Sequence, residues 1–117
     1  MIKNLLFAFI TLMPLSAQDT EPVSWTYEVT KLNSLEYQIS LNAEIIDGWK
    51  LYSQFSPEEG SVATSFTFLN NDNDYVANET FNEDPYIIGY DNVFKMDLFY
   101  FEEKANFNQL LKLNNKD

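Results

Sequence analysis

The sequence predicts an all-β protein whose antiparallel strands pack as a sandwich. Apolar and polar residues alternate with a period of two from Leu35 to Ile45, which indicates a strand with one buried face and one face in water. Turn-forming residues recur roughly every ten positions, and no stretch shows the periodicity of a convincing helix. Several short strands joined by such turns are typical of a β-sandwich.

The first two strands are predicted to pair as a hairpin. Residues 23–29 alternate in the same way as the strand that ends at Ile45, and only residues 31–35 lie between the two. So short a connection favours antiparallel pairing. Asp47-Gly48 is the next turn, and residues 49–52 form the next short strand.

The middle of the chain is predicted to be less regular. Residues 53–63 contain proline and glycine and are expected to form a surface loop, whereas residues 64–69 return to strand composition. Residues 70–74 form a polar turn. Residues 76–90 are the least decipherable, because Pro85 and Gly89 interrupt them, and they are expected to give short edge pieces.

The last third of the chain is predicted to add two more strands. A strand of nine residues over 93–101 is followed by a turn at 102–104 and by a returning strand over 105–113. The side chains predicted to be buried share one parity on the alternating strands; they are Trp25, Tyr37, Ile39, Leu41, Phe66, Phe94, Met96 and Leu98.

The strand count suggests a sandwich that lacks its last strands. Five or six good strands are found where a sandwich usually has about seven, and a strand lies immediately before residues 114–117. Phe99 and Phe101 lie on the face opposite Tyr100 and need cover that the remaining sequence barely supplies. We therefore expect the C-terminal hairpin to be missing.

The first seventeen residues are predicted to be a signal peptide. Lys3 precedes an apolar stretch from Leu5 to Leu15, and Ser16-Ala17 offers small residues before a cut. Eleven residues are too few to span about 30 Å of hydrocarbon as a helix. The other interpretation is an uncleaved anchor. Cleavage would leave residues 18–117 as one domain, periplasmic or secreted, with six lysines against eighteen carboxylates.

Composition excludes several function classes. The 117-residue chain has a formal net charge of −11, and its seven lysines are not clustered, which excludes a nucleic-acid partner bound through a basic surface. It has no cysteine, which excludes disulfides, thiolate metal sites and thiol chemistry by this chain alone. It also lacks histidine, the commonest general base and zinc ligand.

No catalytic, cofactor-binding or metal-binding residue is predicted. The adjacent pairs Glu58-Glu59 and Glu102-Glu103 lie at turns, where their side chains diverge and stay solvated, so they do not suit glycoside hydrolysis. Residues 70–74 are rich in oxygen ligands but lack the glycine and glutamate of a calcium-binding loop. A solvated turn is the simpler interpretation of this run.

Three aromatic residues form a candidate partner-binding surface. Trp49, Tyr52 and Phe55 lie close together in sequence beside a polar loop, and flat aromatic surfaces suit both sugars and protein partners. The alternative is that Trp49 or a neighbour fills the core of the sandwich.

The same stretch carries a resemblance to a known family. The run from Asp47 to Gln54, DGWKLYSQ, is similar to the N-terminal domain of the bacterial transmembrane thiol:disulfide interchange protein DsbD. Residues 22–25, 64–68 and 100–102 resemble this domain in order and spacing, so the resemblance covers most of residues 22–113.

The resemblance implies an immunoglobulin-like sandwich on the periplasmic side of the inner membrane. In that family the domain passes electrons from the membrane-embedded part to periplasmic thiol proteins, through a cysteine pair on a late hairpin. This chain has no cysteine, so no catalytic residue is carried over. It is either a truncated copy, joined to the membrane only through a missing C-terminal region, or a cysteine-free relative that only binds.

Two functions follow from these observations. The first is a non-catalytic domain of a DsbD-like electron-transfer pathway, whose partners are periplasmic thiol-redox proteins or the membrane part of a DsbD-like protein. The alternative is a cell-envelope binding module for a protein or glycan, which uses the aromatic surface around Trp49, Tyr52 and Phe55.

Overall fold

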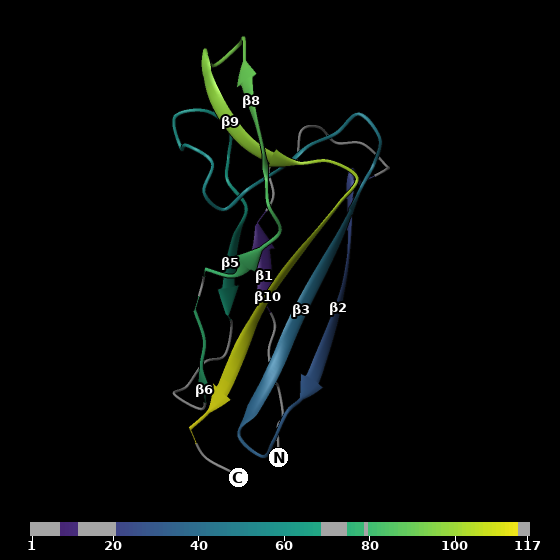
Figure 1. Ribbon diagram of the computed structural model, residues 1–117, viewed down its shortest axis with the longest axis vertical. Helices are drawn as coiled ribbons and strands as arrows, with labels where there is room; N and C mark the ends of the chain where they lie inside the picture. The colour runs from purple at the N-terminus through teal and green to yellow at the C-terminus, as the bar shows by residue number, and fades with distance from the viewer. Residues whose placement is uncertain (1–7, 12–20, 69–74, 79, 115–117) are drawn as a thin grey trace.

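The computed structural model describes residues 8–11, 21–68, 75–78 and 80–114. Every regular element among these residues is a β-strand, and every strand pair is antiparallel (Figure 1). The strands form one large sheet and two small ones. The prediction of an all-β, sandwich-like fold is confirmed. Because the described residues contain no helix, none of them forms a helical membrane span.

The large sheet is built on three long strands and two short ones. Strand β2 (Val23–Lys31) pairs with β3 (Glu36–Ile45), and β3 pairs with β10 (Lys104–Leu113). The far edge of β10 pairs with two short strands, β6 (Tyr75–Val76) and β7 (Asn82–Glu83). The predicted short edge pieces within residues 76–90 therefore include β7.

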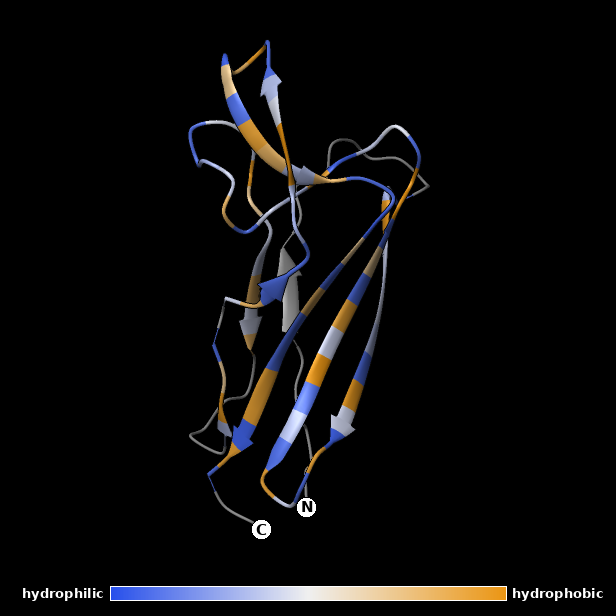
Figure 2. Ribbon diagram, viewed as in Figure 1, coloured by the Kyte–Doolittle hydropathy of each residue, from blue (hydrophilic) through white to orange (hydrophobic). Residues whose placement is uncertain are grey.

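The β2–β3 hairpin forms as predicted. Its register runs from Val23 opposite Ile45 to Lys31 opposite Tyr37. The turn is closed by Asn33, whose Oδ1 accepts hydrogen bonds from two backbone N–H groups within the next three residues, at 2.9 Å each. Apolar and polar residues alternate as bands along β3 (Figure 2), and this alternation places one face in the core.

Two small sheets complete the fold. Strand β1 (Ala8–Thr11) pairs with β5 (Ser65–Phe68). Strand β9 (Met96–Phe101) lies between β4 (Leu51–Tyr52) and β8 (Ile87–Asp91). Strand β1 falls within the predicted signal peptide, and the rest of that segment lies outside the described residues. The predicted polar turn at 70–74 also lies outside them.

The core joins β5 to the large sheet through aromatic rings. Phe66 is 1% exposed, and its ring centroid lies 4.4 Å from that of Phe81 and 5.2 Å from that of Phe107. Trp25 of β2 lies in the same large sheet as Phe107 and meets Phe66 edge-on, with ring centroids 6.4 Å apart. Such contacts between strands of separate sheets are the packing of a sandwich. Burial is confirmed for Ile39, Leu41, Phe66 and Leu98.

The predicted strand over 93–101 is wrong at its beginning. Oδ1 of Asp91 accepts hydrogen bonds from the backbone N–H groups of Val93 and Phe94, which bends these residues into the turn between β8 and β9. Phe94 is therefore 44% exposed, not buried as predicted. Trp25, Tyr37 and Met96 are only half-buried.

The expectation that Phe99 and Phe101 lack cover is also wrong. Phe101 is buried against Phe107, with ring centroids 5.7 Å apart, and Phe99 stacks on Tyr86 at 4.6 Å. Leu98 points to the other face of β9, where it is buried against Gly60. Different parts of the chain therefore cover the two faces of β9.

Candidate functional site

The DGWKLYSQ run begins with a tight turn and a short strand. The backbone N–H of Trp49 donates to the carbonyl of Ile46 at 3.0 Å. Gly48 has φ +91°, a left-handed conformation that glycine adopts without the steric cost of a Cβ atom. The chain then enters β4, whose Leu51 is buried opposite Phe101 of β9.

The last two residues of the run bind a segment thirty positions away. The Ser53 hydroxyl donates to the carboxylate of Glu83. The side-chain amide of Gln54 donates to Glu83 at 2.9 Å and to the carbonyl of Phe81 at 2.9 Å, and its oxygen accepts from the N–H of Phe81 at 2.8 Å. The Gln54 side chain thus gives the backbone N–H and C=O of Phe81, the residue before β7, the hydrogen-bond partners that a neighbouring strand would otherwise supply. We call this set of hydrogen bonds the Gln54 clamp.

The other side of the same loop is fixed to β9. Phe99 accepts a hydrogen bond from the N–H of Ser53 at 2.9 Å, and its own N–H donates to the Ser56 hydroxyl at 3.1 Å. The N–H of Phe55 donates to the Ser53 hydroxyl at 3.0 Å. Residues 53–56, the Phe55 loop, are therefore held from two directions while the Phe55 side chain stays 50% exposed.

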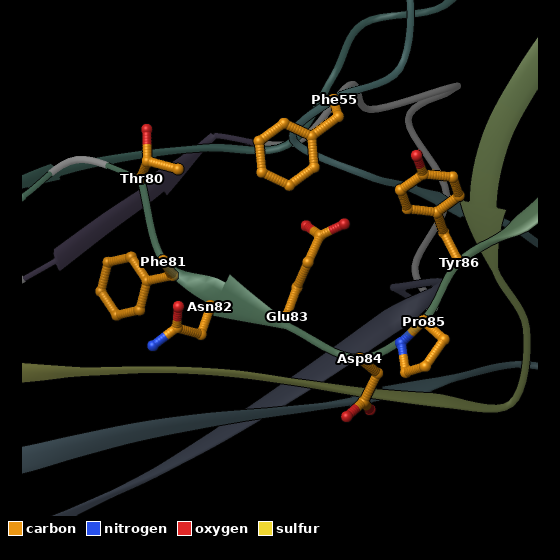
Figure 3. Close-up of a pocket in the computed structure, with 8 residues that line it drawn as sticks. All are labelled: Phe55, Thr80, Phe81, Asn82, Glu83, Asp84, Pro85 and Tyr86. Atoms are coloured by element: carbon orange, nitrogen blue, oxygen red, sulfur yellow. The ribbon is translucent and has the colours of Figure 1, made fainter.

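An open hollow of about 420 Å³ lies beside Phe55. In Figure 3 the Glu83 side chain rises from its strand toward Phe55, Tyr86 stands across from it, and the Asp84 carboxylate points away. The residues that line the Phe55 hollow are Phe55, Thr80, Phe81, Asn82, Glu83, Asp84, Pro85 and Tyr86. Phe55, Tyr86 and the half-buried carboxylate of Glu83 thus line a shared space, together with the buried Phe81.

The three predicted surface residues have different environments. Phe55 lines the hollow, whereas Trp49 is half-buried and packs against the core. Tyr52 is half-buried and meets Tyr100 edge-on, with ring centroids 6.4 Å apart. Trp49 and Tyr52 are not among the residues that line the Phe55 hollow.

The arrangement is suited to binding. Glu83 accepts hydrogen bonds from a hydroxyl and two amide groups, and its aromatic neighbours give flat surfaces for a ligand. Among the described residues, no group of three or more acidic, histidine or cysteine side chains is arranged to hold a metal ion. Phe55 is an exposed aromatic side chain on a loop whose backbone is held by hydrogen bonds, and aromatic side chains are enriched at protein interfaces.

Sequence reasoning missed Glu83 and Tyr86. Both lie in residues 76–90, where no pattern predicted a site, and Glu83 meets its partners across 29 or 30 positions of sequence. The one available indication was the change from Glu83-Asp84 to the apolar run that starts at Pro85.

Comparisons with family models, with curated proteins and with solved structures gave no match to this chain.

Proposed function

We propose that this chain is a binding domain of a DsbD-like thiol:disulfide pathway, which docks a periplasmic thiol-redox protein and performs no thiol chemistry itself. The observation that supports the proposal is the structural role of the DGWKLYSQ run. Its last residues fix the Phe55 loop to β7 and β9 and present Phe55 beside Glu83. A loop whose backbone is already held by hydrogen bonds loses less conformational entropy on binding than a free loop.

The absence of cysteine limits the role of the chain to docking. Thiol–disulfide exchange requires a thiolate that attacks a disulfide sulfur, and this sequence supplies none. Electrons would have to pass between thiols of other proteins while this domain holds one of them. The predicted signal peptide over residues 1–17 would place the domain in the periplasm, where such partners occur.

Calorimetric titration with a thioredoxin-fold periplasmic oxidoreductase tests the proposal. The exported chain should bind the oxidised or the reduced form of this oxidoreductase. Phe55→Ser should weaken that binding about tenfold or more. Leu110→Ser is the matched control, because Leu110 is 43% exposed on β10, and it should leave the affinity unchanged. Failure to bind either form, or equal loss in both variants, would count against the proposal.

A cell-envelope glycan is the second candidate ligand. Phe55 and Tyr86 are aromatic surfaces beside a carboxylate, a combination that stacks on sugar rings and accepts hydrogen bonds from their hydroxyls. Titration with soluble peptidoglycan fragments separates the two functions. Binding that depends on Phe55 would favour the glycan module, and absence of binding would leave the protein partner as the better proposal.

A further inference from the structure

Strand β8 forms an edge of its sheet. The order of strands is β4-β9-β8, so β9 covers one side of β8, and among the described residues no strand pairs with the other side. Figure 1 shows β8 and β9 as a hairpin that projects at the end of the molecule away from the turn joining β2 to β3. An edge of this kind presents unpaired N–H and C=O groups, to which another strand can add.

The hydrogen bonds of Phe99 identify which groups of β8 face outward. Phe99 directs its N–H and its C=O to the Phe55 loop, on the side of β9 away from β8. Its partner across the ladder is Ile88, so these two residues do not exchange hydrogen bonds. The alternation of an antiparallel ladder then turns the N–H and C=O groups of both Ile88 and Tyr90 toward the open edge.

The side chains of the same two residues are exposed and apolar or aromatic. Ile88 is 59% exposed and Tyr90 is 63% exposed. The residue between them is Gly89, where an added Cβ atom would lie 2.7 Å from the Tyr100 hydroxyl, so the strand lies closely over that ring.

β2 is an edge of the large sheet, but Tyr27 is flanked there by exposed polar residues such as Thr26 and Glu28. β8 is therefore the more apolar of these two edges.

Charge restricts what can bind at this edge. Tyr90 lies opposite Asp97 on β9, whereas Asp91 bonds within the hairpin turn and Lys95 lies in that turn, so the attraction for a basic segment comes from Asp97 and from the net charge of the whole chain. A second copy of this chain would bring its own net charge of −11, and an anionic lipid surface would be repelled in the same way. A protein segment that carries lysine or arginine would instead be attracted, and a cation beside Tyr90 could also contact the ring.

We propose that β8 is a strand-acceptor edge, which binds an extended segment of a partner protein in which apolar residues alternate with lysine or arginine. The partner's backbone would pair with Ile88 and Tyr90, and cross-strand side-chain contacts would select its sequence. The site lies next to the Phe55 hollow, because Tyr86 lines the hollow and stacks on Phe99 of β9. It does not depend on the partner being a redox protein.

The probe is a blocked seven-residue peptide that alternates lysine and valine, titrated into the 117-residue chain and followed by backbone amide NMR. We expect shift changes centred on β8 and slower hydrogen exchange at Ile88 and Tyr90. The same peptide N-methylated at every second residue should bind about tenfold more weakly, because it loses backbone hydrogen bonds. A peptide with glutamate in place of lysine should not bind measurably.

Variants of the chain test the same site from the other side. Tyr90→Ser should weaken the lysine–valine peptide at least threefold, whereas Tyr27→Ser, a control at a tyrosine that is 67% exposed on β2, should not. Shift changes centred on β2, equal binding of the N-methylated peptide, or self-association of the chain through β8 would overturn the proposal. The probe is not a redox protein. A negative result with this peptide therefore does not bear on the docking of a thiol-redox partner, which the calorimetric titration tests separately.

Discussion

Replacing Gln54 by alanine is expected to loosen the attachment of the Phe55 loop to β7, leaving only the bonds to Glu83 from the Ser53 hydroxyl and the backbone N–H of residue 54. The substitution removes two hydrogen bonds to the backbone of Phe81 and one to the carboxylate of Glu83. Phe81 is 2% exposed, so its N–H and C=O groups would not be fully satisfied by water. Neutral hydrogen bonds contribute about 0.5–1.5 kcal/mol each and a bond to a charged group about 1.5–3 kcal/mol, which makes a loss of roughly 3 kcal/mol the expected result.

Thermal unfolding followed by circular dichroism measures this effect. For a domain of this size a loss of about 3 kcal/mol lowers the melting temperature by roughly 10–15 °C. Gln38→Ala is the control, because Gln38 donates a single hydrogen bond, to Asn108 at 3.3 Å, and its loss should cost about 1 kcal/mol or less. Equal melting temperatures for the two variants would refute the structural role assigned to the Gln54 clamp.

Three further outcomes follow from the structure. Phe66→Ala should destabilise the fold by about 3–5 kcal/mol in a denaturant titration, because Phe66 is buried. Phe94→Ala should change stability by less than about 1 kcal/mol, because Phe94 is exposed. Similar losses of stability in the two variants would contradict the assigned core. Gly89→Ala should cost about 1–3 kcal/mol in the same assay, since its Cβ would crowd the Tyr100 ring; a neutral result would contradict a tight, rigid contact between Gly89 and that ring. The purified chain should not reduce insulin disulfides, since it has no thiol, and turnover above buffer from a contaminant-free sample would contradict this.

The long strands could be predicted from sequence because their pattern is local. The period-two alternation that ends at Ile45 places one face in the core whatever packs on it, and the short connection around Asn33 determines the pairing of β2 with β3. The strand that begins at Met96 was predicted three residues too long, because Val93 and Phe94 are apolar and resemble a strand. The Asp91 side chain, which bonds to both of their N–H groups, overrides that tendency.

The candidate site could be predicted only in part. Phe55 was identified because an exposed aromatic residue beside a polar loop is visible in the sequence. Glu83 was not, because eighteen acidic residues give no indication of which one is held by a distant serine and glutamine. The open edge at β8 also depends on the sheet order, which local patterns do not determine.

Site-specific photo-crosslinking in intact cells tests the central claim, that this chain docks a thiol-redox protein through the surface around Phe55. A photoreactive phenylalanine analogue is placed at Phe55 in one variant and at Tyr27 on β2 in another, and crosslinked proteins are identified by mass spectrometry. We predict that the variant at position 55 captures a thioredoxin-fold protein with an active-site cysteine pair and that the variant at position 27 does not. Equal capture at both positions, or capture at position 55 of glycan or of proteins without such a pair, would contradict the claim.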